Sequence, residues 1–303
     1  MKRYAAREPA SGLPWINPIG GLGDTLMVSG VLKLVIEEHP SRRFNLIRRT
    51  SYLGILKGHP AIADIGHPPV GATILGTDYW NKEELGPCEK RAFQVLSRMF
   101  GLRTPVEERL YLPGEMEKDP LLHDRLPWRE RNILIAPASI SPRKEMPPVA
   151  WNQLVELLRQ EGCFVAQAGR LNQVHIRNAY SLLGLTTPRQ LVALLRRFNA
   201  VITSDNYVMH AAHLAGTPAI VLWGPTDHRI YGYECQIHLQ APRMCGPDVE
   251  CIGPLRPGTY QTACPLGLRQ CMNQISMTEI MDAVRRCPSS GTINGLERDA
   301  RGN

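Results

Sequence analysis

The sequence predicts an α/β protein with two parallel-sheet domains. Short apolar runs alternate with segments of helical apolar spacing in both halves of the 303-residue chain. Such alternation of strands and helices is typical of parallel sheets. Between the halves, residues 112–132 are rich in proline and charge, as domain linkers are. We therefore expect domains over 1–128 and 129–287, followed by a disordered tail over 288–303.

The first domain is expected to open on a buried strand at 13–17 and a helix at 24–38, whose apolar residues recur at helical spacing. Between 70 and 87 the sequence becomes polar and glycine-rich, and it predicts no regular element. The other expected elements are a strand at 44–47, a short helix at 53–57, a strand end at 63–69 and a helix at 89–100.

The second domain is expected to begin with an apolar strand at 133–136 and an amphipathic helix at 149–160. The carboxyl ends of both sets of parallel strands are predicted to face one cleft, which fits a transferase with two substrates. The remaining elements are strands at 163–167, 200–203 and 218–223, helices at 187–197 and 206–214, and a last helix from the Ser276 and Glu279 capping box to about Cys287.

The composition is that of an ordinary globular protein, with 43% hydrophobic and 21% charged residues. The N-terminus lacks the apolar core of a signal peptide, and no run approaches the roughly 18 apolar residues of a membrane span, so we expect a cytoplasmic protein. The net charge of +7 fits either an anionic partner or a solvated basic surface. We expect no nucleic-acid partner, because no recognised module for one is present.

The stretch "NPIGGLGDTLMVSG" combines a glycine-rich turn with the start of a helix. A phosphate loop would need Gly-Lys-Ser/Thr, but Asp24 follows Gly23. A dinucleotide fingerprint would need a third glycine where Leu26 stands. From these residues alone, Asp24 could be a base at the mouth of a cleft or an N-cap of the helix.

Four segments, taken together, resemble glycosyltransferase family 9, the group of the lipopolysaccharide heptosyltransferases. They are "GGLGDTLMVSGVL", "IAPASISPRKEMPPVAW", the run from "LLGLTTPRQ" through "TSDNYVMHAAHLAGTPAIVLWGPTD", and "CPLGLRQCMNQISMTEIMDAV". The resemblance implies a GT-B architecture of two Rossmann-like domains facing a central cleft. Its N-terminal domain would take the acceptor sugar and its C-terminal domain a nucleotide-activated donor.

The resemblance also implies roles for individual residues. Asp24 matches the family's proposed catalytic base, held by a turn that contains Gly21 and Gly23. Lys144 matches a lysine that contacts the donor's phosphates, where a fixed positive charge would stabilise the departing nucleoside diphosphate. The expected donor and phosphate contacts are Ser139, Arg143, Lys144, Asp205, Asn206, His210 and Thr226.

The implied reaction is an inverting, metal-independent transfer of a sugar, such as heptose from ADP-heptose, to a glycan or lipopolysaccharide-core acceptor. It would need no cofactor, and the protein could be peripheral at the inner face of the plasma membrane. Cys245, Cys251, Cys264 and Cys271 could in principle hold zinc, but their gaps of five, twelve and six residues lack the tight pairs of structural zinc sites. We therefore expect no metal.

Two other classes of function are considered. A catalytically weakened nucleotide-sugar-binding protein of the same fold is favoured by Asn206 and Tyr207, which replace the small pair of the family, and by shortened segments in both domains. A nicotinamide-dependent oxidoreductase is disfavoured, because Arg48 and Arg49 stand where an acidic residue would bind the ribose.

Overall fold

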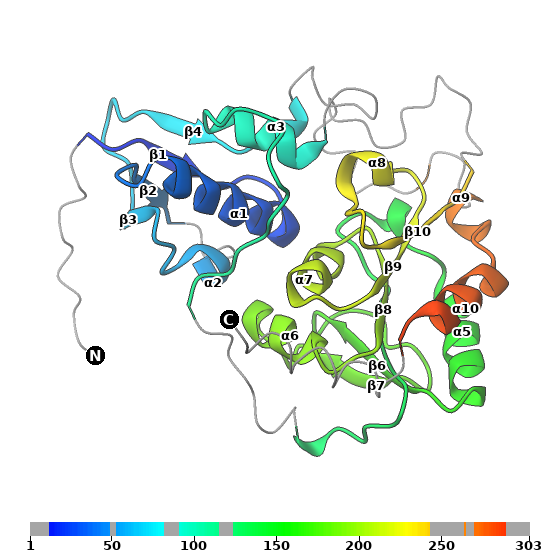
Figure 1. Ribbon diagram of the computed structural model, residues 1–303. Helices are drawn as coiled ribbons and strands as arrows, with labels where there is room; N and C mark the ends of the chain where they lie inside the picture. The colour runs from blue at the N-terminus through cyan, green and yellow to red at the C-terminus, as the bar shows by residue number, and fades with distance from the viewer. Residues whose placement is uncertain are drawn as a thin grey trace. The chain divides into compact units, whose positions relative to one another are not determined.

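The computed structural model describes residues 12–48, 53–81, 91–114, 124–242, 264 and 270–288. The chain divides into two compact units, each with its own parallel sheet (Figure 1). The first unit comprises Met1–Leu85 and Ala92–Glu115, and the second comprises Gly86–Arg91 and Met116–Asn303. Both sheets are parallel throughout, which confirms the predicted α/β class.

The first unit has a four-stranded sheet in the order β3-β2-β1-β4. Its elements are β1 (Trp15–Asn17), α1 (Leu22–Glu38), β2 (Phe44–Ile47), α2 (Leu53–Leu56), β3 (Ile62–Gly66), β4 (Ile74–Gly76), the 3₁₀ helix η1 (Tyr79–Asn81) and α3 (Ala92–Met99).

Helix α1 is the central packing element of the first unit. Most of its apolar side chains, including Leu26 and Val31, are buried. A Cβ atom at Gly30 would stand 2.2 Å from the backbone oxygen of Arg109, so glycine lets the chain cross the helix at close range. This packing fixes α1 and therefore the turn that precedes it.

The second unit has a six-stranded sheet in the order β10-β9-β8-β5-β6-β7. Its strands are β5 (Asn132–Ala136), β6 (Phe164–Gly169), β7 (Tyr180–Leu183), β8 (Ala200–Ser204), β9 (Ala219–Trp223) and β10 (Ile237–Gln240). Its helices are η2 (Pro142–Lys144), α5 (Pro148–Gln160), α6 (Pro188–Leu195), α7 (Tyr207–Ala215), α8 (His228–Tyr231), α9 (Gln270–Asn273) and α10 (Met277–Arg286).

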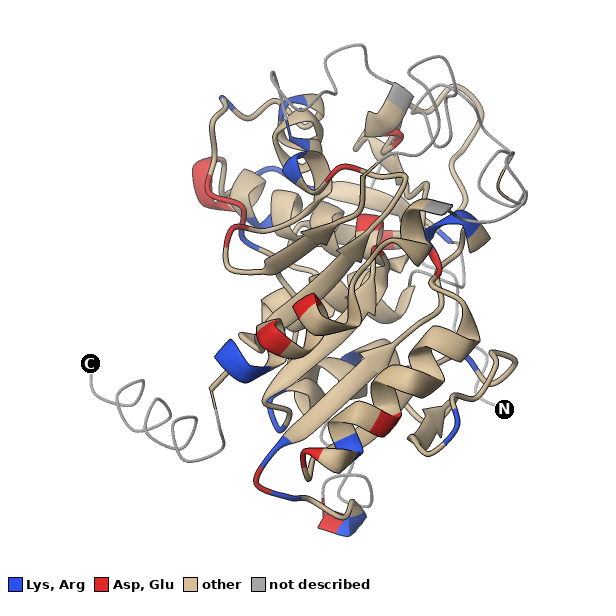
Figure 2. Ribbon diagram, turned by 90° about the vertical axis from the view of Figure 1, so that its right-hand side faces the viewer, with Lys and Arg blue, Asp and Glu red and all other residues tan. Residues whose placement is uncertain are grey.

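The core of the second unit lies on both faces of this sheet. Helices α5 and α10 cover one face and α6 and α7 the other (Figure 1). None of the six strands carries Lys, Arg, Asp or Glu, and the charged residues lie on helices and loops (Figure 2). Strands buried on both faces by helices read as apolar runs, which explains why most of them could be located from sequence.

Three strands, β4, β7 and β10, were not predicted, and each lies at the edge of its sheet. Edge strands are partly exposed and so need no continuous apolar run. The side chain of Ile74 in β4 is 51% exposed, and that of Tyr180 in β7 is 44% exposed. Within the described residues, no helix is both long enough and apolar enough to cross a membrane. Of the tail predicted over 288–303, the residues after Pro288 lie outside the described part of the chain.

Candidate functional site

The strand order marks one position in each sheet where a ligand site is expected. The chain leaves β1 toward β2 on one side and later returns to β4 on the other. In the second unit it leaves β5 toward β6 and returns to β8. At such a switch point the loops after the two neighbouring strands diverge, and parallel α/β sheets bind ligands there, beyond the carboxyl ends of the strands.

Asp24 lies at the switch point of the first unit. It is the third residue of α1, and its Oδ2 accepts the backbone N–H of Gly21 at 2.6 Å. Its Oδ1 accepts the hydroxyl of Tyr79, which follows β4, also at 2.6 Å. The N-cap interpretation of Asp24 is wrong, because Gly21 occupies that position. The carboxylate instead bonds back to the N-cap N–H, as an acidic residue does in a capping box.

The glycine turn is shaped to fit this carboxylate. Gly20 has φ +105°, a left-handed conformation that favours glycine, and a Cβ atom there would stand 2.5 Å from Asp24 Oδ2. Gly21 is the N-cap of α1, and Gly23 is buried in its first turn. The sequence analysis singled out Gly21 and Gly23 in this turn. The structure shows that Gly20 is the position where a side chain would clash with the Asp24 carboxylate.

Lys144 and Asp205 form an ion pair at the switch point of the second unit. Lys144 ends η2 after β5, and Asp205 follows β8, with Lys144 Nζ 2.7 Å from Asp205 Oδ2. The two side chains are 12% and 11% exposed. Burial acts to raise the pKa of Asp205, but the Lys144 ammonium, helped by the Thr226 hydroxyl, lowers that pKa below its ordinary value.

Two further predicted residues, Ser139 and Thr226, belong to this cluster, and Arg143 directly precedes Lys144 in η2. The Ser139 hydroxyl donates to the backbone oxygen of Asp205 at 3.0 Å, and its N–H donates to Glu145 Oε1 at 2.8 Å. Arg143 and Thr226 are both 7% exposed. The structure therefore brings residues from the loops after β5, β8 and β9 together around the Lys144–Asp205 pair.

Asn206 and Tyr207 are engaged within the protein. Asn206 is the N-cap of α7, and its Oδ1 accepts both the N–H of Val208 at 2.8 Å and the hydroxyl of Thr203 at 2.9 Å. Its amide nitrogen donates to the backbone oxygens of residues 136 and 138, so its hydrogen-bonding capacity is filled. The Tyr207 hydroxyl donates to the oxygen of Pro188, at the start of α6. A ligand contact by Asn206 stays a prediction.

His210 lies one turn into α7 and is 6% exposed. Its Nδ1 is 2.7 Å from the hydroxyl of Tyr233, a residue that sequence reasoning did not single out. Burial, chiefly, lowers the pKa of His210 to about 4, despite the opposing charge of Asp205. The imidazole is therefore neutral at neutral pH.

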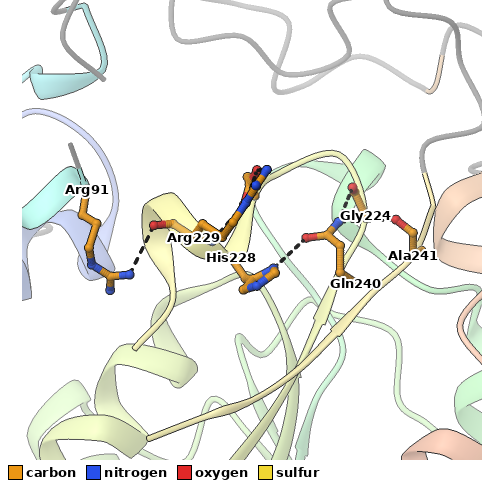
Figure 3. Close-up of polar contacts among 7 residues, drawn as sticks. Arg91, Gly224, His228, Arg229, Gln240 and Ala241 are labelled. Carbon is orange, nitrogen blue, oxygen red and sulfur yellow. Dashed lines mark hydrogen bonds and ion pairs between the residues drawn. The ribbon is translucent and has the colours of Figure 1, made fainter. Parts of the chain in front are cut away.

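The loop that carries Thr226 is held from both ends by side chains (Figure 3). Gln240 donates to the oxygen of Gly224 at 3.1 Å and lies 3.3 Å from His228 Nδ1. The guanidinium of Arg91 donates to the oxygen of Arg229 at 3.2 Å. A bonded loop of this kind presents its backbone and hydroxyl groups in a fixed arrangement.

Comparison with known proteins shows which family this chain matches. Residues 81–250, more than half of the chain, match the family model described as glycosyltransferase family 9 (heptosyltransferase). No significant match is found among curated proteins.

Solved structures with the same fold come from this group of enzymes. The E. coli ADP-heptose lps heptosyltransferase II is 14% identical, with a TM-score of 0.63 over 90% of this chain and 98% of its own. The iron-containing dodecameric glycosyltransferase TibC from enterotoxigenic E. coli H10407 is 15% identical, with a TM-score of 0.67 over 97% and 78%. E. coli heptosyltransferase WaaC with ADP is 12% identical, with a TM-score of 0.57 over 90% and 99%.

Proposed function

The chain belongs to glycosyltransferase family 9 and has the two Rossmann-like units of a GT-B enzyme, and from this premise we propose that it transfers a sugar from a nucleotide-activated donor with inversion. The observation that carries the proposal is the pair of switch-point clusters, one built around the Asp24 carboxylate and the other around the Lys144–Asp205 ion pair. In this proposal the first cluster supplies the proton acceptor, and the second binds the phosphates of the donor.

Asp24 is proposed as the general base. Both of its oxygens are held by neutral donors, the Gly21 N–H and the Tyr79 hydroxyl. These bonds orient the carboxylate without cancelling its charge, so it can still accept a proton from an acceptor hydroxyl. That oxygen would then attack the anomeric carbon while the nucleoside diphosphate departs from the opposite face of the sugar, which inverts the configuration.

Lys144 is proposed to bind the departing diphosphate, together with the N–H groups and hydroxyls of the surrounding loops. An ammonium that is largely buried, as that of Lys144 is, is well suited to stabilise the negative charge that develops on a leaving group. In this proposal the lysine does the work that a divalent ion does in other transferases, so catalysis needs no metal and no cofactor. Of the cysteines considered above as zinc ligands, Cys264 lies within the described residues, whereas Cys245 and Cys251 lie outside them.

The donor is proposed to be an ADP-activated heptose and the acceptor a glycan or lipopolysaccharide-core sugar. Support comes from solved relatives whose structures contain ADP or ADP-D-beta-D-heptose. The net charge of +7 supports an anionic acceptor, or an anionic membrane surface on which that acceptor is presented.

A thermal-shift screen with ADP-, UDP-, GDP- and dTDP-sugars tests the donor proposal. A donor at about one hundred times its Kd should stabilise the fold by roughly 2.7 kcal/mol, and we expect this for ADP-heptose. Release of ADP on addition of a core-sugar acceptor, measured with and without EDTA and alongside the metal content of the protein, tests turnover and metal independence. Stabilisation by none of these nucleotides would contradict the proposal. Binding without ADP release would favour a nucleotide-sugar-binding protein instead.

A further inference from the structure

Tyr233 is a buried tyrosine that contacts two histidines of α7. It lies between α8 and β10 and is 3% exposed. Its hydroxyl is 2.7 Å from His210 Nδ1. Its ring stacks flat on His213, with centroids 3.9 Å apart and an angle of 4° between the planes. The phenol is therefore held at the side of the helix that begins next to Asp205.

The backbone of Tyr233 is fixed as firmly as its ring. Its N–H donates to Gln236 Oε1 at 3.2 Å, and its oxygen accepts a hydrogen bond from His238 Nε2 at 3.0 Å. Gln236 in turn donates to the oxygen of Met209, in the first turn of α7. The position of the hydroxyl relative to His210 is thus determined by a closed set of hydrogen bonds, all within the second unit.

Among the described residues, the hydrogen bond of the His210 ring is made by Nδ1, which leaves Nε2 for a ligand. A neutral imidazole has one N–H donor and one acceptor nitrogen, and Nδ1 is already engaged with Tyr233. The charged and titratable groups that act on the ring are Asp205, His213 and Lys144. Carboxylate and phosphate oxygens are acceptors, so Nε2 can serve a diphosphate beside Asp205 only when it carries the proton.

We propose that Tyr233 is a positioning residue: its hydroxyl donates to His210 Nδ1 and so places the ring proton on Nε2, as a hydrogen-bond donor for the diphosphate of the sugar donor. The proposal rests on the donor site proposed above. It assigns to Tyr233 a task that a phenylalanine of nearly the same shape could not perform, because the aromatic ring alone leaves the imidazole proton free to occupy either nitrogen.

The first test reads the tautomer directly in the wild-type protein. Two-dimensional ¹H–¹⁵N NMR of the histidine rings distinguishes Nε2–H from Nδ1–H, and a His210→Gln variant assigns the signals of His210. We expect the Nε2–H tautomer in the wild type and a mixture of tautomers in Tyr233→Phe. An Nδ1–H tautomer in the wild type would overturn the proposal, and this measurement does not depend on the folding of Tyr233→Phe.

The second test measures ADP binding by titration calorimetry. Tyr233→Phe should weaken ADP binding about three- to tenfold, the effect expected for one oriented hydrogen bond. Tyr180→Phe, which changes a half-exposed tyrosine of β7, should leave the Kd unchanged. Unchanged ADP binding in Tyr233→Phe, while Lys144→Met binds ADP more weakly, would refute the role of Tyr233 alone. Unchanged binding in Lys144→Met would instead refute the donor site.

Discussion

Asp24 and Asp205 both lie at the switch point of their unit, but on different strands and with different partners: Asp24 follows the strand that the chain leaves, and Asp205 follows the strand to which it returns. Each follows the carboxyl end of a strand at a switch point, and each bonds to a residue that follows the neighbouring strand. The partner of Asp24 is the neutral hydroxyl of Tyr79, whereas that of Asp205 is the ammonium of Lys144. One topology therefore presents two acids in different electrostatic settings.

The difference shows how one kind of switch point can support different chemistry. A lowered pKa makes Asp205 a weak proton acceptor, and its charge serves to hold Lys144 in place. The two bonds described for Asp24 come from neutral donors, the Gly21 N–H and the Tyr79 hydroxyl. We infer that the ammonium partner makes Asp205 part of the phosphate site rather than a base.

The largest effect is expected from Asp24→Asn. Asparagine retains an oxygen for the Gly21 N–H, and the Tyr79 hydroxyl can accept from its amide, so the turn should persist. The proton acceptor is lost, and kcat should fall about 10²- to 10⁴-fold with little change in Tm. Asp64→Asn, which alters an acid bonded to the N–H of Ile65 in the same unit, is the matched control. Near-normal turnover by Asp24→Asn would remove the contrast between the two acids.

Lys144→Met should weaken donor binding on the order of 10- to 100-fold, because it removes a charge-assisted contact to phosphate. The variant also leaves Asp205 buried without its cation, which should lower Tm. Adding Asp205→Asn should recover Tm but not donor affinity. Lys33→Met, at a partly exposed lysine of α1, controls for the change in net charge. Calorimetric Kd values at several salt concentrations check this, and recovered affinity in the double variant would count against a direct phosphate contact.

Tyr79→Phe should have a smaller effect, about tenfold on kcat/KM. The hydroxyl orients Asp24 and stabilises its ionised form, so its removal should move the acid limb of the kcat/KM profile to higher pH. The pH–rate profile measures both effects. If the acid limb does not move while kcat/KM falls, the Tyr79 hydroxyl does not stabilise the ionised form of Asp24, and Tyr79 contributes through packing instead.

Acid should destabilise both units alike, through one buried histidine in each. In the first unit, His59 Nδ1 accepts the N–H of Ala61 and Nε2 faces the oxygen of Ser29, and burial lowers its pKa to about 4, as for His210. Below pH 6.5 the unfolded chain binds protons that the folded protein does not, so stability is lost as pH falls toward about 4.

Urea unfolding at pH 7 and pH 5.5 should show a loss of about 1 kcal/mol for each histidine. His59→Gln should reduce this loss, whereas His67→Gln, at an exposed position, should not. An unchanged pH slope in His59→Gln would show that the sensitivity resides elsewhere.

The sequence predicted the parts of the fold and site that depend on local pattern. The strand, glycine turn and helix around Asp24 follow from apolar spacing and turn chemistry within about 25 residues. The family resemblance assigned Lys144 and Asp205 separately to the donor site, but it did not predict the ion pair that the structure shows between them.

Tyr79 and Tyr233 could not be found in this way. Tyr79 follows β4, a three-residue edge strand in a segment with no clear periodicity, and Tyr233 precedes β10, another edge strand. Their hydroxyl contacts are set by tertiary packing between distant segments, and neither residue belongs to a motif. The requirement for glycine at Gly20 likewise arises from the Asp24 carboxylate that approaches it, which only the folded turn reveals.

The distance along the chain between switch-point partners has a consequence for folding. Asp24 and Tyr79 are 55 residues apart, and Lys144 and Asp205 are 61 apart. Contacts of such long range form late, because the intervening loop must first be closed. A nascent chain can therefore build strands and helices of the second unit before it has any phosphate site. A bound nucleotide would then protect the completed unit and leave its partly folded forms exposed to proteases.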